Sequence, residues 1–208
     1  MFAELAQSDG HEVEVDMSAQ GGWTWSHHAT STTTLEKIEQ QNWDFVVLQE
    51  QSVISSIADQ CNEHMYPAAR LLDGKIREGG ADTILFMTWA YRDGLPRAGH
   101  RDFDDMQAQL HVGYMEIADE LGAMVAPVGM VWQNGIVQDP QLGLWQTDGL
   151  HPSIEGSYLA ACVFYAVIYQ QSPEGLMYKA ELSAEMAQFL QAIAAETVLE
   201  NPERWNIP

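Results

Sequence analysis

An acid and an imidazole stand three residues apart in the segment DGLHP, residues 148–152. A short turn can present Asp148 and His151 on one rim, and an apolar, helix-like run over residues 153–169 follows at once. In such a pair the carboxylate fixes the imidazole tautomer and stabilises its cation, so that the ring can act as a general base. The alternative is that Asp148 caps the turn while His151 only begins the helix. The pair by itself predicts half of a hydrolase active site.

Predicted strands alternate with predicted helices along most of the chain. The strand patterns cover residues 11–17, 43–48, 83–87 and 124–128. The helical patterns cover residues 2–7, 34–40, 66–78, 103–121, 153–169 and 182–199. This alternation predicts one α/β domain, residues 1–208, in which helices cover both faces of a mainly parallel sheet.

Polar or glycine-rich loops follow each of the first three predicted strands. They are residues 21–28 (GGWTWSHH), 49–52 (QEQS) and 89–92 (WAYR), and the 148–152 segment follows the last strand. Ligands of parallel sheets gather at the carboxyl ends of the strands. Because four such segments should converge on one edge, we expect the active site there.

These residues, in this order, resemble the SGNH (GDSL-type) hydrolase superfamily. The segment WDFVVLQEQS, residues 43–52, is similar to a variant third block of one bacterial branch. The resemblance covers residues 2–169 and implies a three-layer α/β/α fold with a flavodoxin-like sheet. It also implies Asp148 and His151 as acid and base, Gly22 as a backbone oxyanion donor, and Gln51 in place of the family's Asn. The longer Gln51 side chain is harder to pre-organise than Asn, and Gln49 is the alternative donor.

The family pattern begins with an apolar strand that ends in a Gly-(Asp/Asn)-Ser turn, and residues 1–208 hold no such strand. In that fold the strand lies in the middle of the sheet and carries the nucleophile. We therefore expect the serine upstream of residue 1, in a longer reading frame. The alternatives are a neighbouring chain or rearrangement that fills the gap, and an inactive relative. Ser26 and Ser52 are candidate internal nucleophiles, although loop hydroxyls more often make local turn hydrogen bonds.

The resemblance implies acyl transfer from small carboxylic esters to water. Trp23, Trp25, Trp89 and Trp145 fall near the expected rim. Their rings could stack on an acylated sugar, as in the carbohydrate acetylesterases of the superfamily, or pack in the core. A carbohydrate-binding protein without turnover is the competing class. A third is a homo-oligomer that assembles through the exposed sheet edge.

Composition limits the partners. The 30 acidic and 9 basic residues give a formal charge of −21, which argues against nucleic-acid binding and suits a high-salt environment, where screening relieves self-repulsion. No export signal or membrane span is recognisable, so we expect a soluble, cytoplasmic protein, exported only if a signal lies upstream. Cys61 and Cys162 form no CxxC pair and the histidines lack a ligand spacing, so neither a metal site nor a cofactor is expected.

Overall fold

Three parallel strands form the sheet in the computed structural model, which describes residues 1–208. They are β1 (Phe45–Gln49), β2 (Asp82–Phe86) and β3 (Met124–Ala126), in the order β1-β2-β3. Val47 pairs with Ile84 and Leu85 with Val125, which fixes the register. The interior strand β2 is buried at Thr83, Ile84 and Leu85, as a continuous apolar run predicts.

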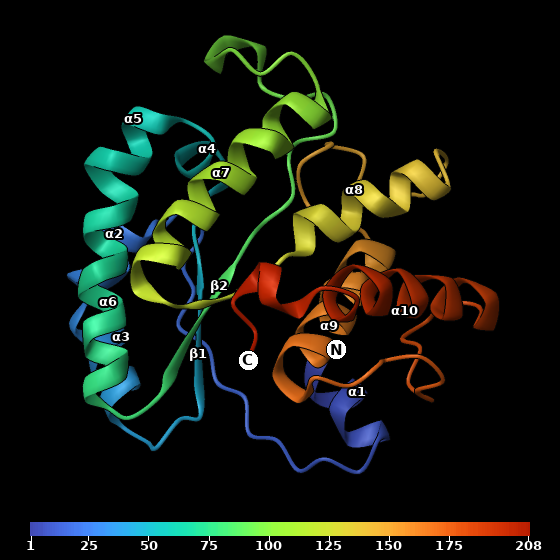
Figure 1. Ribbon diagram of the computed structural model, residues 1–208, viewed down its shortest axis with the longest axis horizontal. Helices are drawn as coiled ribbons and strands as arrows, with labels where there is room; N and C mark the ends of the chain where they lie inside the picture. The colour runs from blue at the N-terminus through green and yellow to red at the C-terminus, as the bar shows by residue number, and fades with distance from the viewer.

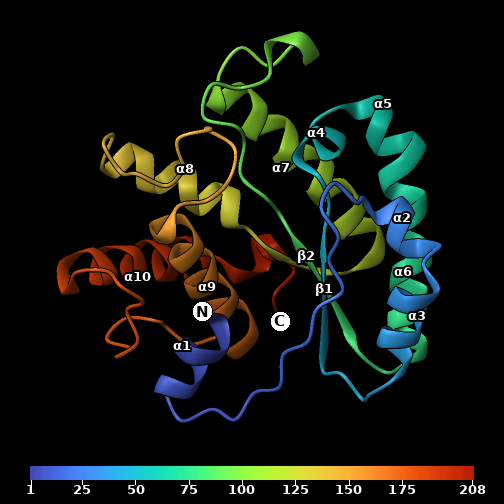
Figure 2. The same cartoon turned by 180° about the vertical axis from the view of Figure 1, so that it is seen from behind.

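Helices cover both faces of the sheet (Figures 1 and 2). One layer contains α2 (Trp25–Ala29), α3 (Thr32–Glu39), α6 (Tyr66–Glu78) and α7 (Phe103–Leu121). The other contains α1 (Phe2–Ser8), α8 (Val128–Gln138), α9 (Ile154–Tyr169) and α10 (Ala184–Leu199). This three-layer α/β/α arrangement confirms the fold class predicted from the sequence.

Shorter helical segments complete the chain. Between β1 and α6 lie α4 (Ser52–Ser55), α5 (Ala58–Gln60) and a π-helical turn (Cys61–Met65). Single 3₁₀ turns occur at Pro96–Ala98 and Pro202–Trp205. None of the helices combines the length and the apolarity that a membrane crossing requires.

Side-chain caps explain why the long helices begin where the sequence predicts. Ser153 accepts the peptide N–H of Gly156 at 3.1 Å and begins α9, and Ser183 accepts that of Met186 at 3.2 Å and begins α10. Helix α8 was not predicted, because it has no side-chain cap and contains two glycines. Gly129 is required by close packing, since a Cβ there would lie 2.3 Å from the Thr88 carbonyl oxygen.

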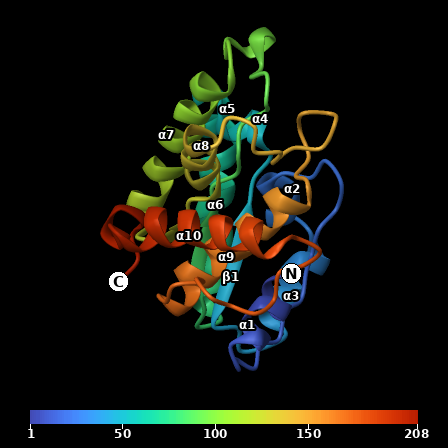
Figure 3. The ribbon, with the colours of Figure 1, turned by 90° about the vertical axis from the view of Figure 1, so that its right-hand side faces the viewer.

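The strand predicted at residues 11–17 is wrong. These residues have no regular secondary structure, and no backbone hydrogen bond joins them to β1, whose only strand partner is β2. Val15 and Met17 are 58% and 74% exposed, and Val47 of β1 is 41% exposed. Alternation supplies an apolar face but not the ladder partner that a strand needs. Figure 3 shows this blue segment, which leads to α2, running along the margin of the molecule.

Candidate active site

His151 and Asp148 form a hydrogen-bonded pair in the loop between α8 and α9. Nδ1 of His151 lies 2.6 Å from Oδ2 of Asp148, and the two side chains are 71% and 42% exposed. Because Nδ1 donates to the carboxylate, Nε2 is left free as the basic nitrogen, and it has no partner in the protein. The structure therefore brings together the acid and base that the sequence predicted.

The Asp148 carboxylate is held ionised by its hydrogen bonds. Its largest stabilising contact is with His151, and the peptide N–H groups of Leu150 and His151 donate to Oδ1 at 2.8 and 3.0 Å. Together they lower the pKa of Asp148 to about 2. Since this pKa lies below the ordinary value of 3.8, the stabilisation is present above pH 3.8 and is lost as the pH falls through 2.

The loop after β2 fastens the turn that carries the pair. The peptide N–H of Arg92 donates to the Gly149 carbonyl at 2.9 Å, and Nε1 of Trp89 donates to the Leu150 carbonyl at 2.9 Å. In the opposite direction, Nε1 of Trp145 donates to the Ala90 carbonyl, in the loop after β2, at 3.1 Å. Gly149 has φ +70°, and a Cβ there would lie 3.1 Å from the Arg92 guanidinium, so glycine suits this position twice over.

Trp89 and Trp145 were predicted to stack on a sugar, but both pack on Trp132, a buried tryptophan outside that prediction. Trp132 is fully buried, stacks on Trp89 at a centroid distance of 4.4 Å, and meets Trp145 edge to face at 5.1 Å. Trp25 is also buried, edge to face with Tyr114, so its prediction as a substrate-binding residue is wrong. Trp25 is the first residue of the short helix α2, and its ring points into the core. This orientation depends on tertiary packing, which the sequence does not reveal.

We predict that Trp89→Phe loosens the turn while keeping the ring stack. Phenylalanine preserves an aromatic face against Trp132 but removes the N–H that holds the Leu150 carbonyl. Amide hydrogen exchange at residues 149–151 should accelerate about fivefold, because one hydrogen bond contributes about 1 kcal/mol. Unchanged exchange would mean that this bond does not restrain the turn. Trp23→Phe is the matched control and should leave these amides unaffected.

The predicted oxyanion donors lie on two other loops at the carboxyl edge, the edge of the sheet where the carboxyl ends of the strands lie. Gly22 has φ +78° and an exposed peptide N–H with no acceptor in the protein. Gln51 precedes α4 with an exposed side-chain amide that likewise bonds to nothing. Gln49, the alternative donor, is exposed at the end of β1. The candidate donors are therefore free to bind an external oxygen.

Ser26 and Ser52 are engaged away from His151. The Ser26 hydroxyl donates to the His64 carbonyl at 3.1 Å, within the π-helical turn. The Ser52 hydroxyl lies 3.0 Å from the Thr88 hydroxyl and donates to the Trp89 carbonyl at 3.2 Å. Both serines lie in short helices, and their hydroxyls bond to residues more than 30 positions away along the chain rather than in a local turn. No hydroxyl of residues 1–208 is hydrogen-bonded to His151.

One residue of this edge was missed by the sequence analysis. Glu50 lies between Gln49 and Gln51, is 1% exposed, and accepts peptide N–H groups from Trp25 at 3.1 Å and Gln51 at 2.7 Å. Its only sequence signal is an acid directly after an apolar strand. The loops bearing Gly22 and Gln51 are thus joined through its carboxylate.

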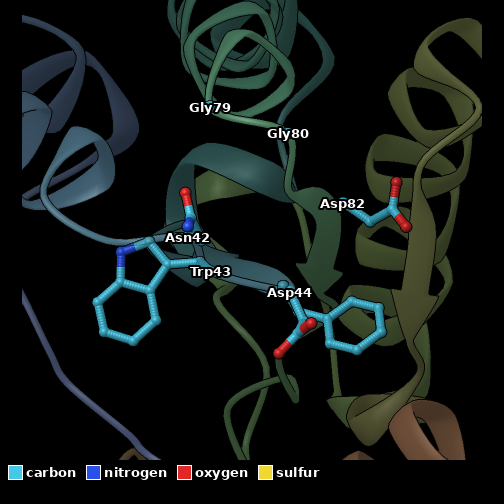
Figure 4. Close-up of a pocket in the computed structure, with 7 residues that line it drawn as sticks. Asn42, Trp43, Asp44, Gly79, Gly80 and Asp82 are labelled. Atoms are coloured by element: carbon cyan, nitrogen blue, oxygen red, sulfur yellow. The ribbon is translucent and has the colours of Figure 1, made fainter.

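A surface hollow of about 540 Å³ lies at the opposite end of the sheet. Figure 4 shows Asn42, Trp43 and Asp44 before β1, with the Asn42 side chain pointing toward the Gly79-Gly80 turn and Asp82 at the start of β2. Its lining includes the carboxylates of Asp44 and Asp82 but no histidine, serine, cysteine, lysine or arginine. The chemically equipped end is therefore the carboxyl edge, where parallel sheets place their ligands.

Comparison with known proteins identifies the family. The model of DUF4886, described as a domain of unknown function, matches residues 24–198. The chain belongs to the DUF4886 family. A crystal structure of a DUF4886 family protein from Bacteroides uniformis superposes with a TM-score of 0.80 at 18% identity, over 96% of this chain and 88% of that one. No curated protein matches the chain.

A second solved structure connects this DUF4886 chain with a hydrolase superfamily. It is a protein from Slackia heliotrinireducens, provisionally described as an SGNH hydrolase, with a TM-score of 0.66 and 28% identity. The match covers 79% of this chain and 89% of that one. The fold is therefore SGNH-like, as the ordered residues of the sequence implied.

Proposed function

We propose that this DUF4886 protein is a carboxylic-ester hydrolase that works by Ser-His-Asp acyl transfer. The observation that carries the proposal is the 2.6 Å hydrogen bond between His151 Nδ1 and Asp148 Oδ2, which leaves Nε2 free at the carboxyl edge of the sheet. The unpaired donors of Gly22 and Gln51 lie on loops of the same edge. The provisional SGNH description of the Slackia protein, at 28% identity, adds support.

In this mechanism each group has one task. His151 Nε2 removes the proton of a serine hydroxyl as its oxygen attacks the ester carbonyl, and Asp148 stabilises the imidazolium that forms. The Gly22 N–H and the Gln51 amide donate to the oxyanion. His151 then returns the proton to the leaving alcohol. Water, activated by the same nitrogen, attacks the acyl-enzyme, releasing the carboxylic acid and restoring the serine.

We place the nucleophile on a strand that pairs with the free edge of β1. That edge has no partner, and the apolar side chain of Val47 within β1 is exposed, as are those of Val15 and Met17 in the segment before α2. Large exposed apolar groups and unpaired strand edges both favour a covering strand. A strand parallel to β1 would end at the same edge as His151. This position agrees with a serine encoded upstream of residue 1.

The substrate proposed is a small ester, such as an acylated sugar. Of the four tryptophans named at the sequence level, Trp23 is half-buried and directly follows Gly22, whereas Trp89 and Trp145 contact Trp132. Trp23 also stacks on His27 at 5.8 Å, and its remaining surface is the one aromatic face we assign to substrate.

A carbohydrate-binding protein without turnover is the second candidate. It is favoured by one observation, namely that no hydroxyl of residues 1–208 is hydrogen-bonded to His151. The two candidates differ in covalent chemistry, and both use the same edge of the sheet.

Hydrolysis of matched esters tests the proposal and its substrate class. Protein isolated from the cells that make it should hydrolyse p-nitrophenyl acetate and acetylated monosaccharides. Trp23→Ala should raise KM for the sugar ester about tenfold, which corresponds to one lost aromatic contact, and leave p-nitrophenyl acetate unaffected. If no ester is hydrolysed while calorimetry detects binding of the sugar, the second candidate is correct. Equal KM changes for both esters would remove Trp23 from the sugar site.

A further inference from the structure

Glu50 is a buried carboxylate that faces no cation. Asp73, the other buried carboxylate, accepts hydrogen bonds from Arg77 at 2.8 Å and from Thr83 at 2.7 Å. Glu50 forms no ion pair, and its partners are peptide N–H groups alone. Burial of a charge without a counter-ion is costly unless hydrogen bonds compensate. The burial of Asp73 is accounted for by its arginine partner, whereas the burial of Glu50 without a cation still has to be explained.

One carboxylate oxygen of Glu50 reaches a second loop, and the other accepts a hydrogen bond within the loop of Glu50 itself. Oε2 accepts the N–H of Trp25, the first residue of α2, three residues after Gly22. Oε1 accepts the N–H of Gln51. The backbone of Glu50 is itself fixed from α7, because its N–H donates to the Tyr114 hydroxyl at 3.2 Å. One side chain thus joins the segments that carry both candidate oxyanion donors.

We propose that Glu50 is a positioning residue whose carboxylate sets the separation of the Gly22 and Gln51 donors by accepting one peptide N–H from each loop. This inference rests on the proposed function for the purpose of those donors, but the joining of the loops can be tested without it. Glu50 touches no reacting atom and acts through the two loops.

A carboxylate is required because both contacts are acceptor contacts. An amide of the same shape offers one oxygen, and its NH₂ group would face the second N–H, donor against donor. Glu50→Gln therefore breaks one of the two contacts without opening a cavity. The loop that is released gains freedom, and its oxyanion donor loses pre-organisation.

Burial also gives the contact a pH dependence. Desolvation raises the pKa of Glu50 to about 7 against the opposing effect of the Gln51 and Trp25 hydrogen bonds. The titratable neighbours are Tyr114 of α7 and Cys61 of the π-helical turn, and burial raises the pKa of both, so they stay protonated at neutral pH. A raised carboxyl pKa contributes stability below pH 4.5 that is lost as the pH rises through 7.

Amide NMR and kinetics of Glu50→Gln test the inference together. In the wild-type protein the amide resonances of Trp25 and Gln51 should titrate together with a midpoint near pH 7, and in Glu50→Gln this titration should disappear. The kcat for an acetyl ester should fall about tenfold with KM unchanged, a smaller loss than removal of an oxyanion donor causes. Asp73→Asn, a buried carboxylate-to-amide change elsewhere, should lower the Tm and leave kcat unchanged.

The positioning role of Glu50 and the proposed ester hydrolysis are overturned by different results. Amides that do not titrate, or a kcat that falls in Glu50→Gln only in proportion to lost folded protein, would overturn the positioning role. A wild-type protein that hydrolyses no ester, but whose two amides titrate together, would overturn the proposed function and leave the joining of the loops intact.

Discussion

Replacing His151 with alanine is expected to lower kcat/KM for ester hydrolysis by about 10⁴-fold or more, the loss that removal of a triad base causes. Among the histidines, only His151 has a ring nitrogen hydrogen-bonded to a carboxylate, and this leaves its Nε2 as the base that takes the serine proton. Asp148→Asn should lower the rate by about 10⁴-fold, because an amide in this place favours the wrong tautomer. The rates are measured with p-nitrophenyl acetate at neutral pH.

His64→Ala is the matched control for this series. His64 is also exposed, and its nearest acid, Glu63, is 3.9 Å away rather than in hydrogen-bond contact. Its removal should leave kcat/KM within about twofold of the wild-type value. A His151→Ala protein that is folded and as active as the wild type would contradict the role of the pair.

Truncation of Trp132 is expected to destabilise the protein by about 3–5 kcal/mol, the cost of removing a large aromatic ring from a closed core. Trp132 is fully buried between Trp89 and Trp145, and its Nε1 has no partner, so the loss is one of packing rather than of a hydrogen bond. For a chain of this length the Tm should fall by about 10 °C. Chemical and thermal unfolding of Trp132→Ala measure the effect.

Val137→Ala, on the same helix α8, controls for helix propensity. Val137 is 75% exposed, so its truncation should change the free energy of unfolding by less than about 0.5 kcal/mol. If the two variants are equally stable, the tryptophan cluster does not support the turn that carries His151. The cluster matters to the site because Trp89 and Trp145 also make the hydrogen bonds between the two loops.

Periodicity and caps made much of the fold predictable. Helices α6 and α7 begin and end at the predicted residues, because apolar spacing marks one helix and Asp102 caps the other. The wrong and missed elements depend on tertiary contacts, which the local sequence does not show. Residues 11–17 alternate like a strand but lack a ladder partner, and α8 is stabilised by tertiary packing despite its two glycines.

The candidate site was predictable where its residues are adjacent in sequence. Asp148 and His151 lie in one turn, so their spacing alone predicted the contact. The join between Glu50 and Trp25 spans 25 residues and depends on where two loops meet in space. Trp25 was predicted to bind substrate but is buried, because its aromatic character does not show whether packing turns the ring toward the core.

Fluorophosphonate labelling followed by peptide mapping shows whether the Asp148 and His151 pair activates a serine. The reagent bonds to an activated hydroxyl. Applied to the protein isolated from the cells that make it, labelling should modify a single serine, outside residues 1–208, and the label should be lost in His151→Ala. A protein that takes no label, or a label that persists unchanged in His151→Ala, would contradict the account.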